Sequence, residues 1–168
     1  MKYIKTYENH KDKTEIWFDR IEDGLPISNM IYDGFDPDTC NEHGMTGLML
    51  VCTYHHYTIL MELILGGADI NYTRPKPSSE ETALDFLIIY DKNTIKIMAL
   101  LIEYGATINP VFIEENKDMI EMELEVQDFI MEYQPDALSL LIKNDIDIKP
   151  EIKEKYPELM DSTELGLL

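Results

Sequence analysis

The sequence contains few basic residues. Its 168 residues include 14 Lys and Arg against 33 Asp and Glu, which gives a formal net charge of −19. Nucleic acids and anionic membranes attract cationic side chains, so this balance argues against direct binding to either. The charge favours a basic protein partner, or mimicry of a polyanion.

Cysteines and long apolar runs are also scarce. Two cysteines cannot build a disulfide framework, which favours a reducing compartment. No apolar run reaches the ~18 residues of a membrane helix, so we expect no membrane span. The opening residues, MKYIKTYENHKDK, lack the apolar stretch of a secretory signal. We therefore expect a cytoplasmic protein, in its own cell or in an infected host.

The sequence nevertheless has the composition of a folded domain with a core. Hydrophobic residues make up 45% of the chain, which argues against disorder. Acidic residues gather in residues 114–132, which hold eight acids and one Lys. We expect an acidic helix here with an apolar inner face; the alternative is that its outer face binds a basic partner. The inner face would contain Met119, Met122, Val126, Phe129 and Ile130.

One pattern recurs four times: an apolar run, a Gly or polar break, then alternating polar and apolar residues. It occurs in MIYDGFDPDTCN (30–41), LILGGADINYT (63–73), LIEYGATINP (101–110) and LIKNDIDIKP (141–150). The break falls at Gly34, Gly67, Gly105 and Asp145, at spacings of 33, 38 and 40 residues. Such spacing indicates stacked similar units. Because Gly adopts left-handed backbone at little cost, we expect a helix to end at this joint.

A second pattern precedes the joint in the two central units. GMTGLMLV (44–51) aligns with EETALDFL (80–87), and the apolar residues that follow recur at helical spacing. Thr46 and Thr82 are placed to cap a first helix with their hydroxyls. Each unit is therefore predicted to contain a helix, a tight turn, a second helix and an extended finger.

These patterns resemble the ankyrin repeat. One repeat keeps Asn41, Gly44, Thr46, Leu48, His56, Leu63, Ile64 and GADIN at 67–71. The next keeps Thr82, Ala83, Leu84, Leu101, Ile102 and GATIN at 105–109. The resemblance covers about residues 14–150 and is most specific at 41–109. Gly47, Met49 and His55 depart from the usual Pro, His and turn Gly, and we expect the Gly at 47 and the Met at 49 to loosen the start of that helix.

The resemblance implies an all-α fold: an ankyrin-repeat solenoid of about four helix-turn-helix units, with short fingers and degenerate caps. The ankyrin-repeat domain would span residues 1–150, and residues 151–168 would form a C-terminal tail. Within the domain we expect clear repeats at about 41–72 and 80–110, and degenerate repeats at about 14–40 and 111–150. The tail ends in Leu165, Leu167 and Leu168, which would dock on the array or join a second copy; the alternative is an ordinary disordered tail.

Residues 40–56, CNEHGMTGLMLVCTYHH, have a loosely zinc-like spacing. The ankyrin register argues against zinc, because it places Cys52 at a small buried position. It places His56 at a turn where an imidazole bonds the backbone of the adjoining unit, and Cys40 and His43 on a finger. We therefore expect a packed thiol and a structural His, with no metal and no cofactor.

No set of residues points to catalysis. A nucleophilic Cys needs an exposed cleft and a nearby His, whereas Cys52 is expected to be buried. Carboxylate pairs carry no information in so acidic a chain. The Gly pair at 66–67 lacks the rest of a phosphate-binding loop. We expect a protein that is not an enzyme.

The resemblance implies a concave binding surface made of finger tips and the exposed face of the first helices. In the first clear repeat this surface would contain Glu42, His43, Met45, Thr53 and Tyr54. In the next it would contain Ser78, Ser79, Glu81, Ile89 and Tyr90, and the long finger adds Tyr72, Arg74 and Lys76. Tyr and Arg anchor interfaces well. Surface Tyr and Ser also occur without function, so both interpretations stay open for each residue.

Three classes of function follow. The leading hypothesis is a non-catalytic protein-binding module, with self-association through the tail as a further option. The opening MKYIKTYEN resembles the starts of small accessory proteins of tailed phages, which would make the chain a factor that blocks a host defence protein. The alternative is an acidic mimic of nucleic acid that occupies a basic cleft. A hidden hydrolase or metalloenzyme would predict a bound metal.

Overall fold

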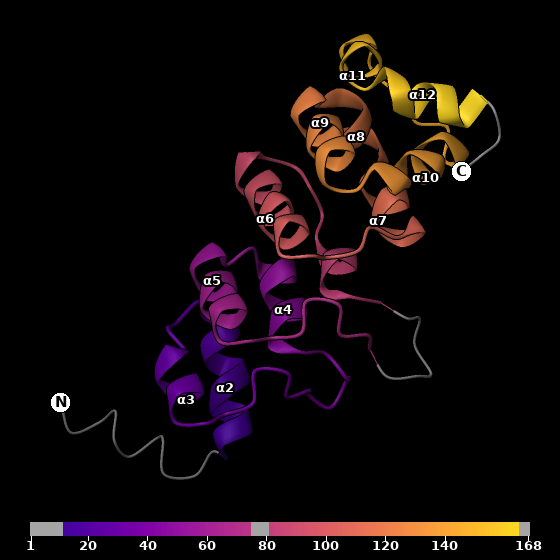
Figure 1. Cartoon of the computed structure of the whole chain (residues 1–168). Coiled ribbons are helices and arrows are strands. Elements are labelled where there is room, and N and C mark those ends of the chain that lie inside the picture. The colour runs from indigo at the N-terminus through magenta and orange to yellow at the C-terminus, as the bar shows by residue number, and fades with distance from the viewer. Residues whose placement is uncertain (1–11, 75–80, 165–168) are drawn as a thin grey trace. The chain divides into compact units, whose positions relative to one another are not determined.

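The computed structural model describes residues 12–74 and 81–164, and every regular element in these ranges is a helix (Figure 1). The expectation of an all-α fold is confirmed. The chain divides into two compact units, one ending at Phe86 and one beginning at Leu87. Within the ranges described, no helix is long and apolar enough to cross a membrane.

The first unit is built around α4 (Gly47–Tyr54). This helix packs against α2 (Lys13–Glu22), α5 (Tyr57–Leu65) and η1 (Ala83–Phe86), a 3-10 turn. The short helix α3 (Ser28–Tyr32) follows α2. Six successive residues at the start of α4 are buried, which explains the apolar run GLMLVC, since a helix that is apolar on all sides lies inside a fold.

Aromatic and aliphatic side chains fill the core of the first unit. Trp17, Leu48, Met49 and Leu63 are at most 1% exposed. Trp17 also stacks on Phe35, with ring centroids 4.7 Å apart, and so ties α2 to the loop that follows α3. Met49 stands where the ankyrin pattern has His, and its complete burial favours an apolar side chain there.

The two ends of α4 follow the predicted local chemistry. The Thr46 hydroxyl accepts from the N–H of Met49 at 3.4 Å, so the predicted N-cap is confirmed. A Cβ atom at Gly47 would lie 2.6 Å from Cδ1 of Ile21, so glycine lets α2 approach α4 closely. The helix ends at His55, whose φ of 59° takes the left-handed conformation usually given to glycine.

The predicted first helix of the next repeat is much shorter than expected. Thr82 precedes only the four-residue turn η1, and both its N–H and its hydroxyl donate to Oδ2 of Asp85, at 2.7 and 3.0 Å. The chain then runs outside any helix through residues 87–90. Three successive residues there, Ile88, Ile89 and Tyr90, are of the β-branched and aromatic types that favour extended backbone.

The predicted joint is present in the first unit. Gly67 has a φ of 88° and donates its N–H to the carbonyl of Ile64 at 3.1 Å. The next N–H, of Ala68, bonds the carbonyl of Leu63 at 3.0 Å. Together the two bonds form a Schellman cap, which ends a helix with a left-handed residue. Gly34 has the same conformation, with a φ of 85°, so the equivalence of these two glycines is confirmed.

The same joint occurs twice in the second unit, at Gly105 with a φ of 95° and at Asp145 with a φ of 55°. Both have the same two hydrogen bonds. The bonded pairs are Gly105 with Ile102, Ala106 with Leu101, Asp145 with Ile142, and Ile146 with Leu141. All four positions predicted from the sequence therefore share one backbone conformation. Asp replaces Gly at the last of these positions, and Asp adopts left-handed backbone more readily than most other residues do.

The second unit packs around α9 (Leu124–Tyr133), which contacts α6, α8, α11 and η2. The other elements are α6 (Lys92–Glu103), α7 (Pro110–Glu115), α8 (Lys117–Met122), η2 (Pro135–Ala137), α10 (Leu138–Lys143), α11 (Pro150–Lys155) and α12 (Pro157–Glu164). Residues 106–109 and 146–149 lead directly into α7 and α11, each of which starts with Pro. The predicted finger is therefore replaced by a short extended segment at both places.

The acidic segment 114–132 is not one helix. It breaks at Asn116 and again at Glu123, whose φ and ψ of −101° and 109° are extended. The break changes which side chains point inward: Val126 is buried as expected, whereas Met122 is 69% exposed. Ile130 is also buried, and Met119 and Phe129 are half-buried.

The predicted boundary between domain and tail at residue 150 does not match the structure. Helix α11 packs against α9, and its Ile152 is 1% exposed. At the end of α11 the Lys155 ammonium donates to Oδ1 of Asp128 at 2.6 Å, and the hydroxyl of the next residue, Tyr156, donates to the same oxygen at 3.1 Å. This part of the predicted tail therefore belongs to the second unit. Residues 165–168, with the apolar end expected to dock or to self-associate, lie outside the described residues.

Three amide side chains hold extended segments of the second unit, and we call these contacts amide brackets. In each, the amide accepts from one backbone N–H and donates to the carbonyl two residues earlier, as a neighbouring strand would. The brackets are Asn116 with Leu87 and Ile89, Gln134 with Ala106 and Ile108, and Gln127 with Asp147 and Lys149. Gln127 is fully buried and also donates to the carbonyl of Ile120 at 2.9 Å.

Candidate interaction surface

The first finger is a tight hairpin closed by one side chain. Oδ1 of Asn41 accepts from the N–H groups of His43 and Met45, at 2.9 and 3.0 Å. The backbone N–H of Asn41 donates to the carbonyl of Met45 at 2.9 Å. Gly44, with a φ of 73°, supplies the left-handed residue of the turn. The pattern Asn-x-x-Gly thus fixes the shape of the finger tip and leaves the side chains between them exposed.

Residues 69–74 are tied to residues 38–43, in and before the first finger, by three contacts. Each contact joins two residues that are 31 or 32 positions apart in the sequence. The N–H of Asp69 bonds Oδ1 of Asp38 at 2.9 Å. The Cys40 thiol lies 3.3 Å from the Tyr72 hydroxyl, and Nε of Arg74 donates to the carbonyl of His43 at 2.9 Å. We call these three contacts the finger ladder. Their spacing is close to the 33 residues that separate the joints at Gly34 and Gly67.

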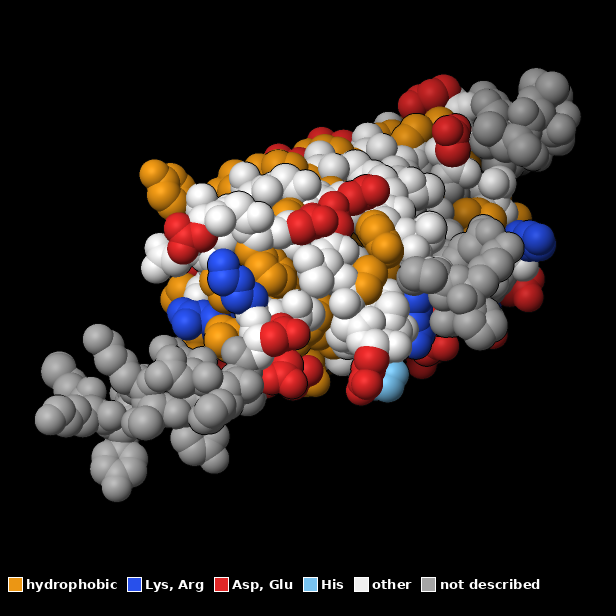
Figure 2. Space-filling model, turned by 90° about the horizontal axis from the view of Figure 1, so that it is seen from below, with side chains coloured by type: hydrophobic (Ala, Val, Ile, Leu, Met, Phe, Trp, Pro, Cys, Tyr) orange, Lys and Arg blue, Asp and Glu red, His pale blue; other side chains and the backbone are white. Residues whose placement is uncertain are grey.

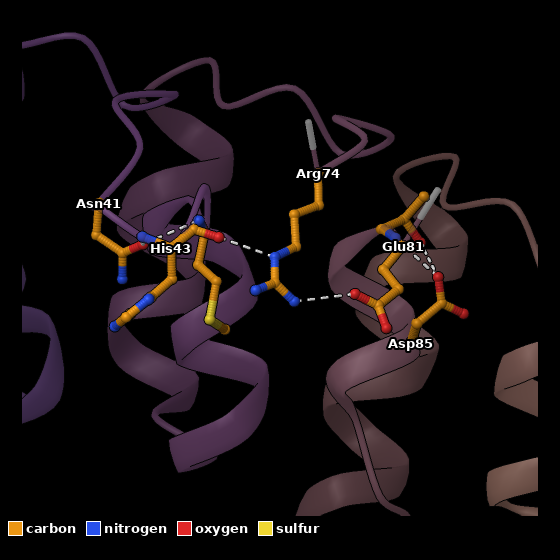
Figure 3. A network of polar contacts seen from close by, with 7 residues as sticks. Asn41, His43, Arg74, Glu81 and Asp85 are labelled. Atoms are coloured by element: carbon orange, nitrogen blue, oxygen red, sulfur yellow. Dashed lines mark hydrogen bonds and ion pairs between the residues drawn. The ribbon is translucent and has the colours of Figure 1, made fainter. Parts of the chain in front are cut away.

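The Arg74 side chain bridges His43 and Glu81 (Figure 3). Its guanidinium reaches from the carbonyl of His43 to Oε2 of Glu81, which lies 3.1 Å from Nη1. The backbone N–H of Arg74 also donates to the carbonyl of Glu81 at 2.9 Å. The side chains of Arg74 and Glu81 are only 23% and 25% exposed. Both were predicted to contact a partner, but most of their surface is used in contacts within the chain.

Two groups in the finger ladder have shifted pKa values. The hydrogen bond with the Cys40 thiol raises the pKa of the Tyr72 phenol. Partial burial raises the pKa of Asp38, although the bond from the N–H of Asp69 acts in the opposite direction. Both shifts are typical of groups that pack against neighbouring polar atoms.

Of the remaining predicted contacts of the first unit, those that the structure describes are mostly exposed. Glu42 and His43 project from the finger tip, with their side chains 87% and 67% exposed and 3.6 Å apart. Thr53 is exposed, and Tyr54 is 44% exposed at the end of α4. Met45 is half-buried. Lys76, Ser78 and Ser79 lie outside the described residues.

The two predicted contacts of the second unit behave differently from each other. Tyr90 is 57% exposed, as expected. Ile89 is only 2% exposed, and its N–H bonds Oδ1 of Asn116 at 2.6 Å, so the expectation that it lies on an exposed helix face is wrong. In an extended segment, side chains alternate between two faces, and this alternation turns Ile89 inward.

Cys52 and His56 occupy packing positions. Cys52 is fully buried, and this burial raises the pKa of its thiol far above the ordinary value. Nε2 of His56 lies 3.0 Å from the carbonyl of Glu22 at the end of α2, so this imidazole does contact the backbone of a neighbouring segment. The same ring lies 3.1 Å from where a Cβ atom of Gly24 would stand. Among the residues that the structure describes, no three His, Cys, Asp or Glu side chains are placed to hold a metal ion.

Acidic side chains are spread over the surface. Figure 2 shows one face on which carboxylates lie among polar and hydrophobic side chains, whereas basic side chains occupy fewer places. In the second unit, Glu114, Glu115, Asp118 and Glu125 are all exposed. The charge of the acidic segment is therefore available to a basic partner.

Several residues that shape these surfaces were not predicted from the sequence. Asp38 and Asp69 each bond the backbone N–H of another finger residue, and the motifs Asp-x-Asp at 36–38 and Asp-x-Asn at 69–71 could have indicated such turns. Asn116 and Gln127 were also missed. Asn116 stands among charged residues in EENKD and Gln127 is followed by Asp128, so nothing in the sequence indicates that these amides are buried.

Comparison with protein-family models, with characterised proteins and with solved structures gave no match to this chain.

Proposed function

We propose that the chain is a non-catalytic protein-binding module of ankyrin-like construction, which holds a partner protein on its fingers and first helices. The observation that carries the proposal is the finger ladder. In stacked repeats, corresponding segments of successive units lie side by side, and the ladder joins residues 31 or 32 positions apart, close to the 33-residue spacing of Gly34 and Gly67. Such scaffolds carry variable, exposed side chains on loops whose ends are held by a rigid framework.

The proposed contacts are the exposed side chains of the first unit. Glu42 and His43 stand on the finger tip, and Tyr54 offers a large amphipathic side chain of the kind that anchors interfaces. The carboxylates around them favour a basic partner. Arg74 and Glu81 support this surface, because the Arg74 guanidinium bonds the carbonyl of His43 in the first finger and is itself bonded by Glu81.

The proposal is tested by affinity capture at low salt, with the intact chain immobilised and exposed to lysate of its native or host cell. We expect to capture one protein partner in stoichiometric amount. The double substitution His43→Ala/Tyr54→Ala should lower the affinity for this partner by at least about tenfold. The matched control is Tyr57→Ala, because Tyr57 is 40% exposed but lies on the second helix of the repeat. Capture of no stoichiometric protein would contradict the proposal.

A second candidate function is mimicry of nucleic acid, which the exposed carboxylates of segment 114–132 favour. Binding would then depend on total charge more than on any one residue, and would weaken steeply with salt. Reversing any four of these acids should abolish it, and unchanged affinity would exclude this function. The idea that the partner is a host defence protein rests on residues 1–9, which lie outside the described residues.

A further inference from the structure

The second unit contains a groove whose floor is an extended segment. Leu87 and Ile89 are at most 2% exposed, whereas Ile88 and Tyr90 are 43% and 57% exposed. The segment therefore buries one face and offers the other to solvent. The amide bracket from Asn116 fixes it, since its amide bonds the carbonyl of Leu87 and the N–H of Ile89 at 2.9 and 2.6 Å.

Residues at the junction of α7 and α8 form the wall of this groove, which has a volume of ≈ 530 Å³. Its apolar lining includes Ile88, Tyr90 and Met119, and its acidic lining includes Glu114, Glu115 and Asp118. All three carboxylates are exposed. An exposed apolar strip beside three carboxylates fits a ligand that carries both apolar and cationic groups.

The carboxylates of the groove are not neutralised by the neighbouring cation. Lys117 also lines the groove, but its ammonium donates to the carbonyl of Asn144 at 2.6 Å. Within the described part of the second unit, the ion pairs join Lys153 to Asp147 and Lys155 to Asp128, and neither includes a carboxylate of the groove. The negative charge of the groove thus remains available.

We propose that this groove binds an extended basic segment of a partner protein, in which Arg or Lys alternates with apolar residues. The inference rests on the proposed protein-binding function and adds a second contact site to it. Alternation fits because extended chains place every second side chain on one face. The apolar side chains of the partner would pack on Ile88 and Met119. Tyr90 would add to this apolar strip, and the cations would meet the carboxylates of Glu114 and Asp118.

The test uses the intact chain and a synthetic heptapeptide that alternates Arg with Leu, with binding measured by fluorescence anisotropy at physiological salt. A peptide of equal charge that alternates Arg with Gly is the probe for charge alone. We expect the Arg/Leu peptide to bind the unsubstituted chain at least about tenfold more tightly than the Arg/Gly peptide. Equal affinity for both peptides would overturn the proposal, because the apolar strip would then contribute nothing.

Matched variants locate the site. Glu114→Lys/Asp118→Lys should weaken binding of the Arg/Leu peptide by at least about tenfold. Glu121→Lys/Glu125→Lys changes the net charge equally outside the groove lining and should leave affinity within about twofold. Tyr90→Ala should also weaken binding, whereas Tyr104→Ala should not, although Tyr104 is 47% exposed. Equal losses in groove and control variants would overturn the proposal.

The failure of this inference can be distinguished from failure of the proposed function. If the Tyr90 and Glu114/Asp118 variants bind the peptide like the unsubstituted chain, the groove is not the site. In that case a partner that is still captured, and still released by His43→Ala/Tyr54→Ala, leaves the protein-binding function intact. Loss of peptide binding in the groove variants, with their thermal unfolding midpoints unchanged, supports the groove itself.

Discussion

In the first unit, neighbouring extended segments are tied by the finger ladder, whose members lie at the partly exposed edge of the fold. In the second unit the corresponding segments are tied by amide brackets, and Gln127 in one of them is fully buried. Both units end helices at the same left-handed joint. The joint therefore sets where the chain turns, and the residues that follow it decide how the next segment is held.

The difference has an energetic consequence. Bonds at a partly exposed edge can be replaced by bonds to water when one partner is removed, whereas a buried N–H or carbonyl has no such replacement. We expect the second unit to be more sensitive to loss of one amide than the first unit is to loss of one ladder contact. The first unit should be correspondingly tolerant of changes at its fingers, which suits a surface that binds a partner.

The largest effect is expected for Gln127→Met, which keeps the length of the side chain but removes its amide. Three backbone groups, at Ile120, Asp147 and Lys149, lose their partner. The free energy of unfolding should fall by about 2–4 kcal/mol, since buried unpaired polar groups are costly. Urea unfolding of the intact chain measures this. Asn93→Ala, at an exposed position, is the control, and a loss below that of Tyr72→Phe in the finger ladder would contradict the comparison.

A smaller effect is expected for Gly105→Ala at the joint. No atom lies within 4 Å of where its Cβ would stand, so the cost comes from the backbone conformation alone. The free energy of unfolding should fall by about 1–2 kcal/mol, as for other L-residues placed in left-handed backbone. Gly67→Ala in the first unit is the matched variant, because its Cβ would also meet open space. Unequal losses at these two positions would show that the joints are not equivalent.

Next in size is Arg74→Ala in the finger ladder. This substitution removes the bonds to the carbonyl of His43 and to Glu81. Because the guanidinium is partly solvated, the unfolding free energy should fall by only about 1 kcal/mol. Denaturant unfolding gives the value, with Lys13→Ala on α2 as the control for loss of a cation. A loss as large as that of Gln127→Met would mean that the two kinds of tie do not differ.

The smallest effect, with the opposite sign, is expected for Asp145→Gly. Asp145 is a non-glycine residue with a φ of 55°, and glycine would relieve its backbone strain. The unfolding free energy should rise by a few tenths to about 1 kcal/mol. The thermal midpoint of the variant provides the measurement. A decrease would indicate that the Asp side chain stabilises the joint by more than its backbone costs.

The joints could be predicted from the sequence because their chemistry is local. A left-handed residue that ends a helix favours Gly, and Gly34, Gly67 and Gly105 meet that requirement by residue type alone. The cap at Thr46 and the burial of Cys52 followed from the same local register.

The errors arose where a distant residue determines the local structure. The segment at Ile88 and Ile89 is held extended by Asn116, which lies 27 residues beyond Ile89, so the predicted helix face was wrong there. The acidic segment has a helical apolar spacing overall, but an extended Glu123 divides it and turns Met122 outward. The groove could not be predicted for the same reason, since its floor and its wall come from separate segments.

The claim that fingers and first helices form the binding surface is tested most directly by site-specific photo-crosslinking. A benzophenone amino acid placed at Tyr54, at the exposed end of α4, should form a crosslink to the partner protein in lysate. The same probe at Tyr57, on the second helix, should form none, although the two tyrosines are similarly exposed at 44% and 40%. Crosslinks that form equally at both positions, or at Tyr57 alone, would contradict the account.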